Sequence, residues 1–396
     1  MGLGTSSLAL RRSSALLLAL AAFVGLIALA GCGSSGNGTT SSETSSSSKP
    51  AETTSEGGGE SSIPAPPEAP EPGIGVSTPL TKTPPSGKTI GALVCELPAC
   101  EGYVKPYEEA AEKLGWKVET FVYKSGEPGP AMQQAINQKV DYIAITGQPP
   151  ALFEDQLKAA NAAGIPVISG DDVTPPDPNT GLYTQFGDAS MFEAQSEQMG
   201  LWILGDAGSE PAHVAYVTIE SYPILEVGFP ALEKTLKKYC SECTLEKLPL
   251  TVEDLGEGKG PAKVVAFLQS HPEVNYLNFS FVDLMTGVPE AMKAAGMTNV
   301  QIVGQALSES EYVVEQIKNG AIPAWVAQAI DYQSWLMVDA MARISVDQFS
   351  LKEAEAAAKM PTWVISSPAT LKYLEPNNKW AGPPGFEEEF EQLWGV

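Results

Sequence analysis

Short apolar runs alternate with longer amphipathic runs along most of this chain, and this alternation is the feature that most restricts its fold. The first apolar run, Thr89–Val94, has the composition of a buried strand, and the next run, Val104–Leu114, carries apolar residues at helical spacing. Strands that are each followed by a helix pair in parallel, because a parallel connection requires a crossover. The alternation therefore predicts an α/β fold with parallel sheets and helices on both faces of each sheet.

The same alternation defines the other expected elements. Expected strands are Lys117–Tyr123, Tyr142–Thr146, Ile165–Ser169, Gly181–Phe186, His213–Ile219, Thr244–Leu248, Asn275–Phe279, Val300–Val303 and Ala324–Ala327. Expected helices are Pro130–Gln138, Pro150–Ala162, Ala189–Leu204, Leu225–Tyr239, Ala262–Ser270, Val288–Ala295, Glu309–Asn319 and Tyr332–Ser345. The 308 residues after Lys88 (396 − 88) suffice for two lobes at roughly 100 to 200 residues per domain. Ligands of parallel sheets bind at the carboxyl ends of the strands, so we expect the functional site in a cleft between the lobes.

The N-terminal segment has the order of parts of a signal peptide. Arg11 and Arg12 precede an uncharged run, Ala15–Ala30, which is shorter than the ~20 residues that a membrane-spanning helix needs. Leu29-Ala30-Gly31-Cys32 resembles the lipobox of bacterial lipoproteins. This resemblance implies that residues 1–31 are removed and that Cys32 is acylated, which anchors the protein to the outer face of the cell membrane. A retained transmembrane helix and ordinary secretion with an incidental Cys32 are the alternatives.

Residues 32–88 are predicted to carry the lipid at Cys32 and to form a disordered tether. The stretch is rich in Ser, Thr, Gly, Pro and Glu and has few bulky apolar residues, so it cannot bury a core of its own. As a flexible coil its ends would lie roughly 40 Å apart. We interpret it as a spacer between the lipid anchor and the folded part.

Four cysteines remain after Cys32, and they form two close pairs. Cys95 is followed by Cys100, and Cys240 is followed by Cys243. An even number of closely spaced cysteines outside the cytoplasm predicts two local disulfides. A redox dithiol at Cys240 is the alternative, but the first cysteine of such a motif begins a helix, whereas Cys240 follows a predicted one.

The charge and the histidine count exclude several kinds of partner and site. The chain has 48 acidic and 24 basic residues and a formal net charge of −24. Such a surface repels phosphate backbones, so we expect no nucleic-acid partner. The only histidines are His213 and His271, which excludes a histidine-rich metal site. We expect no metal and no cofactor.

The sequence favours binding over catalysis. His213 opens a predicted strand and His271 precedes a proline in a turn, so neither is placed for a Ser-His-Asp triad. Asp172 and Asp283 could form a glycosidase pair, but acid pairs are common in so acidic a chain. The glycine-rich stretch 256–260 lacks the strand-then-helix context of a phosphate-binding loop. We therefore expect that the protein is not an enzyme.

The order of elements from Thr89 to about Thr370 resembles the type I periplasmic binding proteins, in particular the ribose- and sugar-binding branch that serves ABC importers. The matching stretches are Ile90–Val94 (IGALV), Glu108–Gly115, Gln138–Ile145 (QKVDYIAI), Leu157–Ile168 (LKAANAAGIPVI), Val303–Gly304 and Val326–Gln328 (VAQ). The resemblance implies two doubly wound parallel-sheet lobes joined by a three-segment hinge, with crossings near residues 186–188, 329–332 and 360–363. It implies an N-terminal lobe of residues 89–187 and 330–360, and a C-terminal lobe of residues 188–329 and 361–396 that includes the tail.

The sugar-gripping residues of that family are largely absent. Sugar-binding members stack two phenylalanines that follow a proline after the first strand, and the matching positions here are Pro98, Ala99 and Cys100. The family's Asp-Arg pair after the fourth strand matches Asp171 and Asp172, so the arginine is replaced by a second acid. The cleft is therefore expected to lack the bidentate donors that grip sugar hydroxyls.

Polar and aromatic residues in the loops that follow the predicted strands are the candidate ligand contacts. They are Tyr103, Gln148, Asp171, Asp172, Tyr222, Phe281, Asp283, Gln305 and Gln328, with Glu96, Thr146, Gln185, Glu220 and Ser221 nearby. Acids and amides accept hydrogen bonds and aromatic rings offer flat apolar faces, so this set suits a neutral or cationic ligand.

These observations predict an extracytoplasmic solute-binding lipoprotein of an ABC importer, which closes two lobes on a small molecule. The expected partners are that ligand, a membrane ABC permease and, through the lipid, the membrane, and the protein is expected to be a monomer. A sugar is the first candidate ligand. The alternatives are a non-sugar aromatic or polar cyclic compound, and a role as the ligand-sensing partner of a membrane sensor.

Overall fold

The computed structural model of the protein describes residues 63–67, 69–70, 73–306, 311–366, 368–374 and 379–396. The expected signal peptide (1–31), the expected lipidation at Cys32 and the expected tether as far as residue 62 lie outside the described residues. Within the described ranges, none of the helices combines the length and the apolar composition that a bilayer crossing requires.

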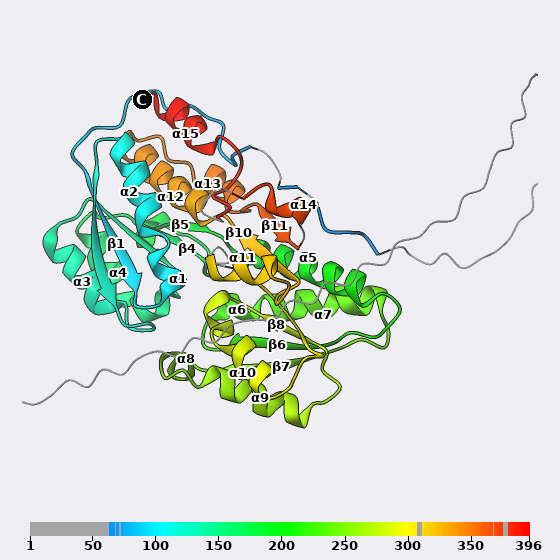
Figure 1. The fold of residues 1–396 in the computed structure, drawn as a ribbon. Coiled ribbons are helices and arrows are strands. Elements are labelled where there is room, and N and C mark those ends of the chain that lie inside the picture. The colour runs from blue at the N-terminus through cyan, green and yellow to red at the C-terminus, as the bar shows by residue number, and fades with distance from the viewer. Residues whose placement is uncertain (1–62, 68, 71–72, 307–310, 367, 375–378) are drawn as a thin grey trace, which may run out of the picture. The chain divides into compact units, whose positions relative to one another are not determined.

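The first lobe is built on a parallel sheet with the strand order β2-β1-β3-β4-β5 (Figure 1). Its strands are β1 (Thr89–Cys95), β2 (Lys117–Tyr123), β3 (Tyr142–Thr146), β4 (Val167–Gly170) and β5 (Leu182–Phe186). The central strands are almost continuously apolar and buried, as the pattern TIGALVC of β1 illustrates. Such strands are covered by helices on both faces, which is why they carry no polar alternation.

The second lobe is built on a sheet with the strand order β11-β10-β9-β8-β6-β7. Its strands are β6 (His213–Ile219), β7 (Thr244–Leu250), β8 (Tyr276–Phe279), β9 (Gln301–Gln305), β10 (Ala324–Gln328) and β11 (Thr362–Ile365). All neighbours pair in parallel except β11, which pairs antiparallel with β10 at the edge. The expected fold class, two doubly wound parallel-sheet lobes, is confirmed.

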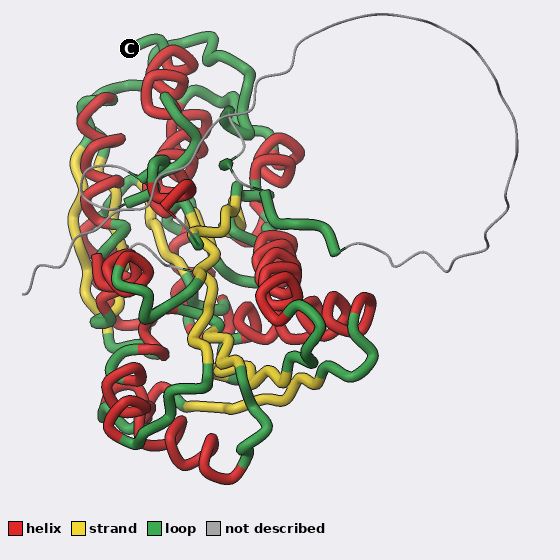
Figure 2. Tube along the Cα trace, turned by 45° about the vertical axis from the view of Figure 1, so that its right-hand side comes forward, coloured by secondary structure: helices red, strands yellow, loops and turns green. Residues whose placement is uncertain are grey.

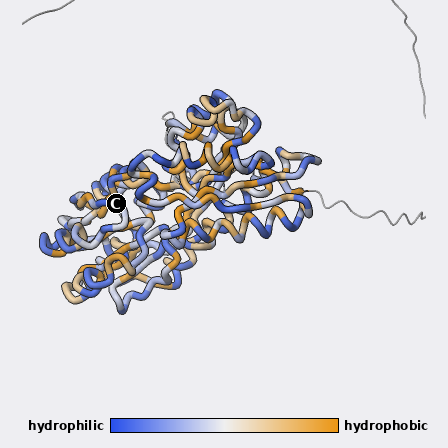
Figure 3. The backbone as a smooth tube through the Cα atoms, turned by 90° about the horizontal axis from the view of Figure 1, so that it is seen from below, coloured by the Kyte–Doolittle hydropathy of each residue, from blue (hydrophilic) through white to orange (hydrophobic). Residues whose placement is uncertain are grey.

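Helices cover both faces of each sheet, and Figure 2 shows them in red beside the yellow strands. On the first lobe they are α1 (Pro98–Glu101), α2 (Val104–Lys113), α3 (Gly129–Gln138), α4 (Glu154–Ala162), α12 (Ile330–Ser345) and α13 (Leu351–Ala357). On the second they are α5 (Ala189–Ala207), α6 (Pro223–Glu226), α7 (Gly228–Tyr239), α8 (Val252–Gly256), α9 (Gly260–Ser270), α10 (Val288–Ala294), α11 (Glu311–Lys318) and α14 (Pro368–Leu371). Hydrophobic stretches run through the interior of the trace and hydrophilic ones along its outer turns (Figure 3).

The chain passes between the two sheets at short segments that form the hinge. It leaves the first sheet after β5, and α5 then packs against β9, β10 and β11. It returns at Ala329, since α12 packs against α2, β4 and β5. After α13, which packs on β5, it passes to β11 of the second sheet. Three backbone segments that lie far apart in the sequence therefore connect the two lobes.

The C-terminal tail differs from the expectation. In the tail, the ring of Trp380 lies against Trp363 of the second lobe, but α15 (Phe386–Trp394) packs on α12 of the first lobe. Lys113 of α2 also forms an ion pair with Glu391 at 2.6 Å. The assignment of all of residues 361–396 to the second lobe is therefore wrong for α15. Its buried side chains pack on the aromatic rings of Tyr332 and Trp335 in α12, and the sequence of the tail does not indicate which lobe carries those rings.

The expectation of a disordered tether is wrong for the described residues 73–88. The backbone N–H of Gly75 donates to the Tyr332 hydroxyl at 2.9 Å, and the indole N–H of Trp116 donates to the Pro85 carbonyl at 2.8 Å. Val76 is buried against the first lobe. Isolated apolar residues are too few to form a core, but each can fill a gap in a surface that the lobe has already formed. These residues are therefore a docked segment.

Both expected disulfides are present. Cys95 pairs with Cys100, and Cys240 pairs with Cys243 directly after α7. Each closes a short loop.

We predict that Trp394→Ala destabilises the protein by about 3–5 kcal/mol, the usual cost of truncating a buried aromatic residue. The Trp394 ring stacks on Trp335 with 5.6 Å between centroids, and its indole N–H donates to buried Asp339 at 2.8 Å. Urea unfolding measures the effect, with exposed Gln392→Ala as the control in the same helix. Equal unfolding free energies for Trp394→Ala and the wild type would show that α15 does not stabilise the lobe.

Candidate functional site

A cavity of about 80 Å³ lies between the carboxyl ends of the strands of the two sheets. It is lined from the first lobe by Cys95, Leu97, Ala99, Cys100, Tyr103, Ser125, Thr146, Gly147, Gln148 and Asp171, and from the second lobe by Phe192, Ile219, Tyr222, Ile224, Leu225, Val252, Leu255, Phe281, Ala306 and Gln328. The parallel topology brings these residues together, because every strand that enters the cleft ends at the same edge of its sheet.

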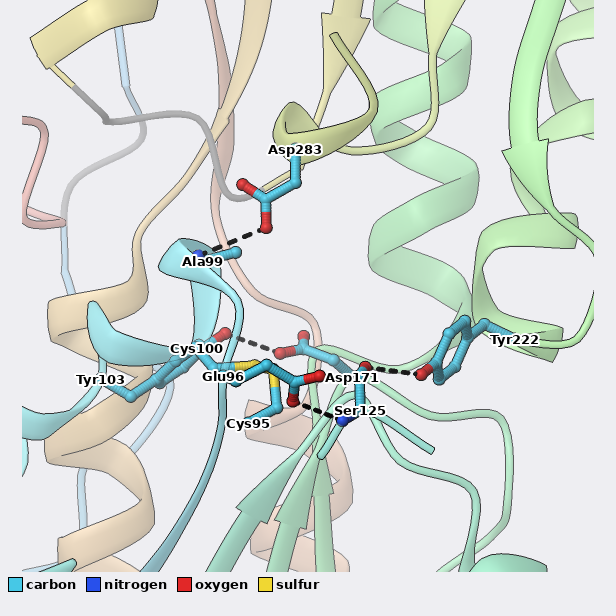
Figure 4. Close-up of a disulfide and its surroundings, with 9 residues drawn as sticks. All are labelled: Cys95, Glu96, Ala99, Cys100, Tyr103, Ser125, Asp171, Tyr222 and Asp283. Carbon is cyan, nitrogen blue, oxygen red and sulfur yellow. Dashed lines mark hydrogen bonds between the residues drawn. A yellow bond between two sulfur atoms is a disulfide. The ribbon is translucent and has the colours of Figure 1, made fainter. Parts of the chain in front are cut away.

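The Cys95–Cys100 disulfide forms part of the wall on the first lobe (Figure 4). Cys95 is the last residue of β1 and Cys100 lies in α1, so the bond holds the loop between them against the end of the strand. Here the loop presents sulfur and the small side chain of Ala99, which are apolar and lack the flat face of a ring.

Asp171 is the central polar group of the cavity. It follows β4 in the left-handed region, with φ of 57°, a conformation that aspartate adopts more readily than most residues. Its carboxyl accepts hydrogen bonds from the Tyr103 hydroxyl at 2.7 Å, from Gln328 Nε2 at 3.0 Å and from Gln333 Nε2 at 3.1 Å. Burial raises the pKa of Asp171 to about 6, because desolvation outweighs the hydrogen bonds, which lower it.

The partners of Asp171 lie on both sides of the hinge. Gln328 ends β10 just before the crossing at Ala329, and Gln333 follows that crossing in α12. Gln333 Nε2 also donates to the Phe186 carbonyl, at 3.0 Å, where β5 leads into the first crossing. A single network of hydrogen bonds therefore connects the cavity to two segments of the hinge.

Two hydrogen bonds connect the lobes beside the cavity (Figure 4). The hydroxyls of Ser125 and Tyr222 lie 2.9 Å apart, and the backbone N–H of Ala99 donates to Asp283 at 3.4 Å. Burial raises the pKa of Asp283 to about 6, although the bond from Ala99 lowers it. Both contacts join residues of different lobes, so they form only when the lobes approach each other.

Six of the residues expected at the site line this cavity: Tyr103, Gln148, Asp171, Tyr222, Phe281 and Gln328. Thr146 also lines it. Their role in ligand binding stays a prediction.

Three expected site residues lie elsewhere. Asp172 accepts a hydrogen bond from the Thr174 N–H at 2.8 Å and faces a separate cavity, which Gln185 also lines. Asp283 forms the contact to Ala99, and Gln305 accepts from the Ser196 hydroxyl at 2.8 Å. Asp172 follows Asp171 in the chain, and consecutive residues of a turn point in different directions.

The remaining nearby candidates are also outside the cavity. The Glu96 carboxylate accepts a hydrogen bond from the Ser125 backbone N–H and thereby holds the loop that carries Ser125. Glu220 and Ser221 are exposed.

Ser125 and most of the apolar wall were not among the expected site residues. Ser125 follows β2, and Val252 and Leu255 follow β7, so both loops leave a strand at the edge where the site lies. That topological signal was sufficient to find them. Ile219 and Ile224 lie at the end of β6 and just after it, but a buried apolar residue at a site and one in a core look alike in sequence.

The charged groups of the cavity lining are few. Among the described residues, those that line it include no lysine, arginine or histidine. His213 lies at the start of β6 and His271 at the end of α9, where its Nδ1 lies 2.8 Å from the Phe267 carbonyl. An anion would find no countercharge in this lining, whereas a neutral molecule would find hydrogen-bond partners and apolar surface.

Comparison with known proteins identifies a family. A model of the periplasmic binding protein domain matches residues 103–348. The chain has no match among curated protein sequences.

Solved structures with the same fold share low identity with the chain. A carbohydrate transporter from Acidothermus cellulolyticus, in complex with myo-inositol, aligns with a TM-score of 0.61 and 20% identity over 77% of this chain and 99% of that one. A solute-binding protein from Burkholderia graminis, in complex with D-arabinose, gives 0.60 and 18% over 74% and 100%. A 5-methylthioribose transporter solute-binding protein from Thermotoga lettingae gives 0.59 and 16% over 78% and 100%. At these identities the likeness establishes the fold.

We predict that Asp283→Asn flattens the pH dependence of stability. The pKa of Asp283 lies above its unfolded value near 4, so its contribution is complete below about pH 4 and is lost as the pH rises through about 6. The loss for this group is roughly 3 kcal/mol, from about two pKa units. Asparagine keeps an acceptor for the Ala99 N–H and does not ionise.

Urea unfolding between pH 4 and pH 8 measures this difference. Glu273→Gln removes one exposed charge on the same lobe and serves as the control. Parallel stability curves for the wild type and Asp283→Asn would contradict the assigned pKa.

Proposed function

The chain belongs to the periplasmic binding protein domain family, and from this premise we propose that it is the extracytoplasmic solute receptor of an ABC importer. The observation that carries the proposal is the cavity that both lobes build from the carboxyl ends of their strands. The protein would bind a small molecule there and release it unchanged to a membrane permease.

Closure of the lobes supplies the mechanism. A solute that contacts both lobes binds the closed form more tightly than the open form, so it shifts the population toward closure by its differential affinity. The Ser125–Tyr222 and Ala99–Asp283 contacts also favour the closed form, and they join the two lobes directly rather than through the solute. The hinge segments next to Asp171 would respond to an occupied site through Gln328 and Gln333.

The proposed location follows from the N-terminal sequence. Leu29-Ala30-Gly31-Cys32 is the basis for proposing a lipid anchor at Cys32 on the outer face of the membrane. The docked segment 73–88 would fix the point at which the chain that leads to the anchor leaves the first lobe.

A neutral sugar or a related cyclic compound is the proposed solute class. The solved structures of similar fold include proteins in complex with myo-inositol and D-arabinose. The lining agrees with a neutral molecule, because its polar groups are hydroxyls, amides and the Asp171 carboxyl, whose oxygens already accept hydrogen bonds from Tyr103, Gln328 and Gln333.

We predict that at least one neutral cyclic solute raises the melting temperature of the protein. At a concentration one hundred times its dissociation constant, a ligand adds about 2.7 kcal/mol of stability. The panel contains monosaccharides, cyclitols, nucleosides and aromatic acids, and calorimetry then gives the affinity. Asp171→Ala should abolish binding of the solute found, while exposed Glu220→Gln should leave it intact. Unchanged affinity in Asp171→Ala would remove Asp171 from the site.

We predict that Tyr222→Phe weakens solute binding by roughly 2- to 12-fold, which corresponds to the 0.5–1.5 kcal/mol of one hydrogen bond. Ser125→Ala should cause the same loss of affinity, because it removes the other partner of the same hydrogen bond. The double variant should therefore bind the solute no more weakly than either single variant. Tyr373→Phe removes a hydroxyl from a more exposed tyrosine and serves as the control. Additive effects of the two single variants would show that the contact between Ser125 and Tyr222 does not stabilise the closed form.

A further inference from the structure

Most polar side chains of the cavity lining come from the first lobe. That lobe contributes Tyr103, Ser125, Thr146, Gln148 and Asp171, beside the apolar Leu97, Ala99 and the Cys95–Cys100 disulfide. The second lobe contributes a wall of apolar side chains, chiefly Ile219, Ile224, Leu225, Val252, Leu255 and Phe281. We call these six residues the aliphatic wall, although Phe281 is aromatic. Of the described second-lobe residues at the cavity, Tyr222 and Gln328 carry the polar side chains.

Those two polar groups of the second lobe are directed toward the first. The Tyr222 hydroxyl is bonded to Ser125, and Gln328 Nε2 is bonded to Asp171. The polar contacts therefore gather on one side of the cavity, and the aliphatic wall faces them without hydrogen-bonding capacity.

Gln328 fixes the direction of one hydrogen bond to a ligand. Its Nε2 donates to oxygens of Asp171 and Gln333, so a reversed amide would place oxygen against oxygen. Its Oε1 is fully buried, lacks a hydrogen-bond partner and belongs to a residue that lines the cavity. Leaving such an oxygen unpaired is costly, and a ligand that donates a hydrogen bond removes the cost.

Gln148 provides a second polar contact on the same side. Its Oε1 is also buried without a partner, and the residue is only 3% exposed. A ligand with two hydroxyls on this side has a donor for each of the two amide oxygens.

The aliphatic wall selects against hydroxyls on the opposite side of the ligand. A hydroxyl that faces Ile224 or Leu255 would lose its hydrogen bonds to water and gain none, whereas a methylene or methyl group would gain from burial. The volume of about 80 Å³ is about half of the roughly 150 Å³ that holds benzene, so a single ring already requires the lobes to part slightly and a larger compound requires more.

We propose that, within the receptor function proposed above, the solute is a neutral single-ring compound with one polar edge and one apolar edge. One edge carries at least two neighbouring hydroxyls, which donate to Gln328 and pair with Gln148. The other edge carries hydrogen, alkyl or thioalkyl groups, which pack on the aliphatic wall. A ring with hydroxyls on all sides is the disfavoured ligand.

Matched pairs of ligands test this by calorimetry on the wild-type protein. Cyclohexane-1,2-diol and myo-inositol share one carbon ring and differ in the hydroxyls of the far edge, and 5-methylthioribose and ribose differ in one terminal group. We expect the member with the apolar edge to bind at least about tenfold more tightly in each pair, or 1.4 kcal/mol. The dimethyl ether of cyclohexane-1,2-diol, which cannot donate, should bind at least tenfold more weakly than the diol.

Equal or tighter binding of myo-inositol and ribose would overturn this inference and leave the receptor function standing. The same holds if the dimethyl ether binds as well as the diol. Failure of every compound in the wider solute panel to bind would overturn both proposals.

A variant tests whether the aliphatic wall causes the preference for the ligand with the apolar edge. Leu255→Gln should narrow or reverse the preference within each pair, whereas Val122→Asn, at an exposed site on β2, should leave it unchanged. An unchanged preference in folded Leu255→Gln would also overturn the inference, and the wild-type measurements stand if that variant does not fold.

Discussion

A buried carboxyl group at the junction of the two lobes is the feature on which the rest of the site depends. Asp171 is held by Tyr103 from the first lobe, by Gln328 from the last residue of β10 and by Gln333 from the helix that follows the crossing. Removing a carboxyl group from water is expensive, and these donors offset only part of the cost, which is why its pKa is raised to about 6. The network thus places the acid that lines the cavity next to the hinge. Any molecule that alters its surroundings also acts on the segments that set the distance between the lobes.

The pattern of the sequence was sufficient to predict the fold and most of the polar side chains that line the cavity. Alternating strands and helices imply parallel sheets, and parallel sheets bring the ends of their strands to one edge, so Asp171 and Gln328 could be placed at the cavity from their positions after β4 and at the end of β10. The direction of side chains within a turn could not be predicted in the same way. Asp171 and Asp172 are neighbours in sequence, yet they face different cavities.

The parts that sequence did not predict share a physical cause. The aliphatic wall, the docked segment and α15 each place apolar side chains against a surface that another part of the chain forms. Apolar composition indicates that a side chain will be buried, but not against which partner. Val76 in a polar stretch and Trp394 in an acidic helix could therefore be recognised as apolar anchors, while the lobe that receives them could not.

The central claim is that two lobes close on a solute between them. The most direct measurement is the distribution of distances between spin labels at exposed positions on each lobe, such as Gln134 on α3 and Lys293 on α10, by pulsed electron paramagnetic resonance. Addition of a saturating solute that raises the melting temperature should narrow the distribution and shift it to shorter distances. A distribution that stays unchanged at saturation would contradict the account.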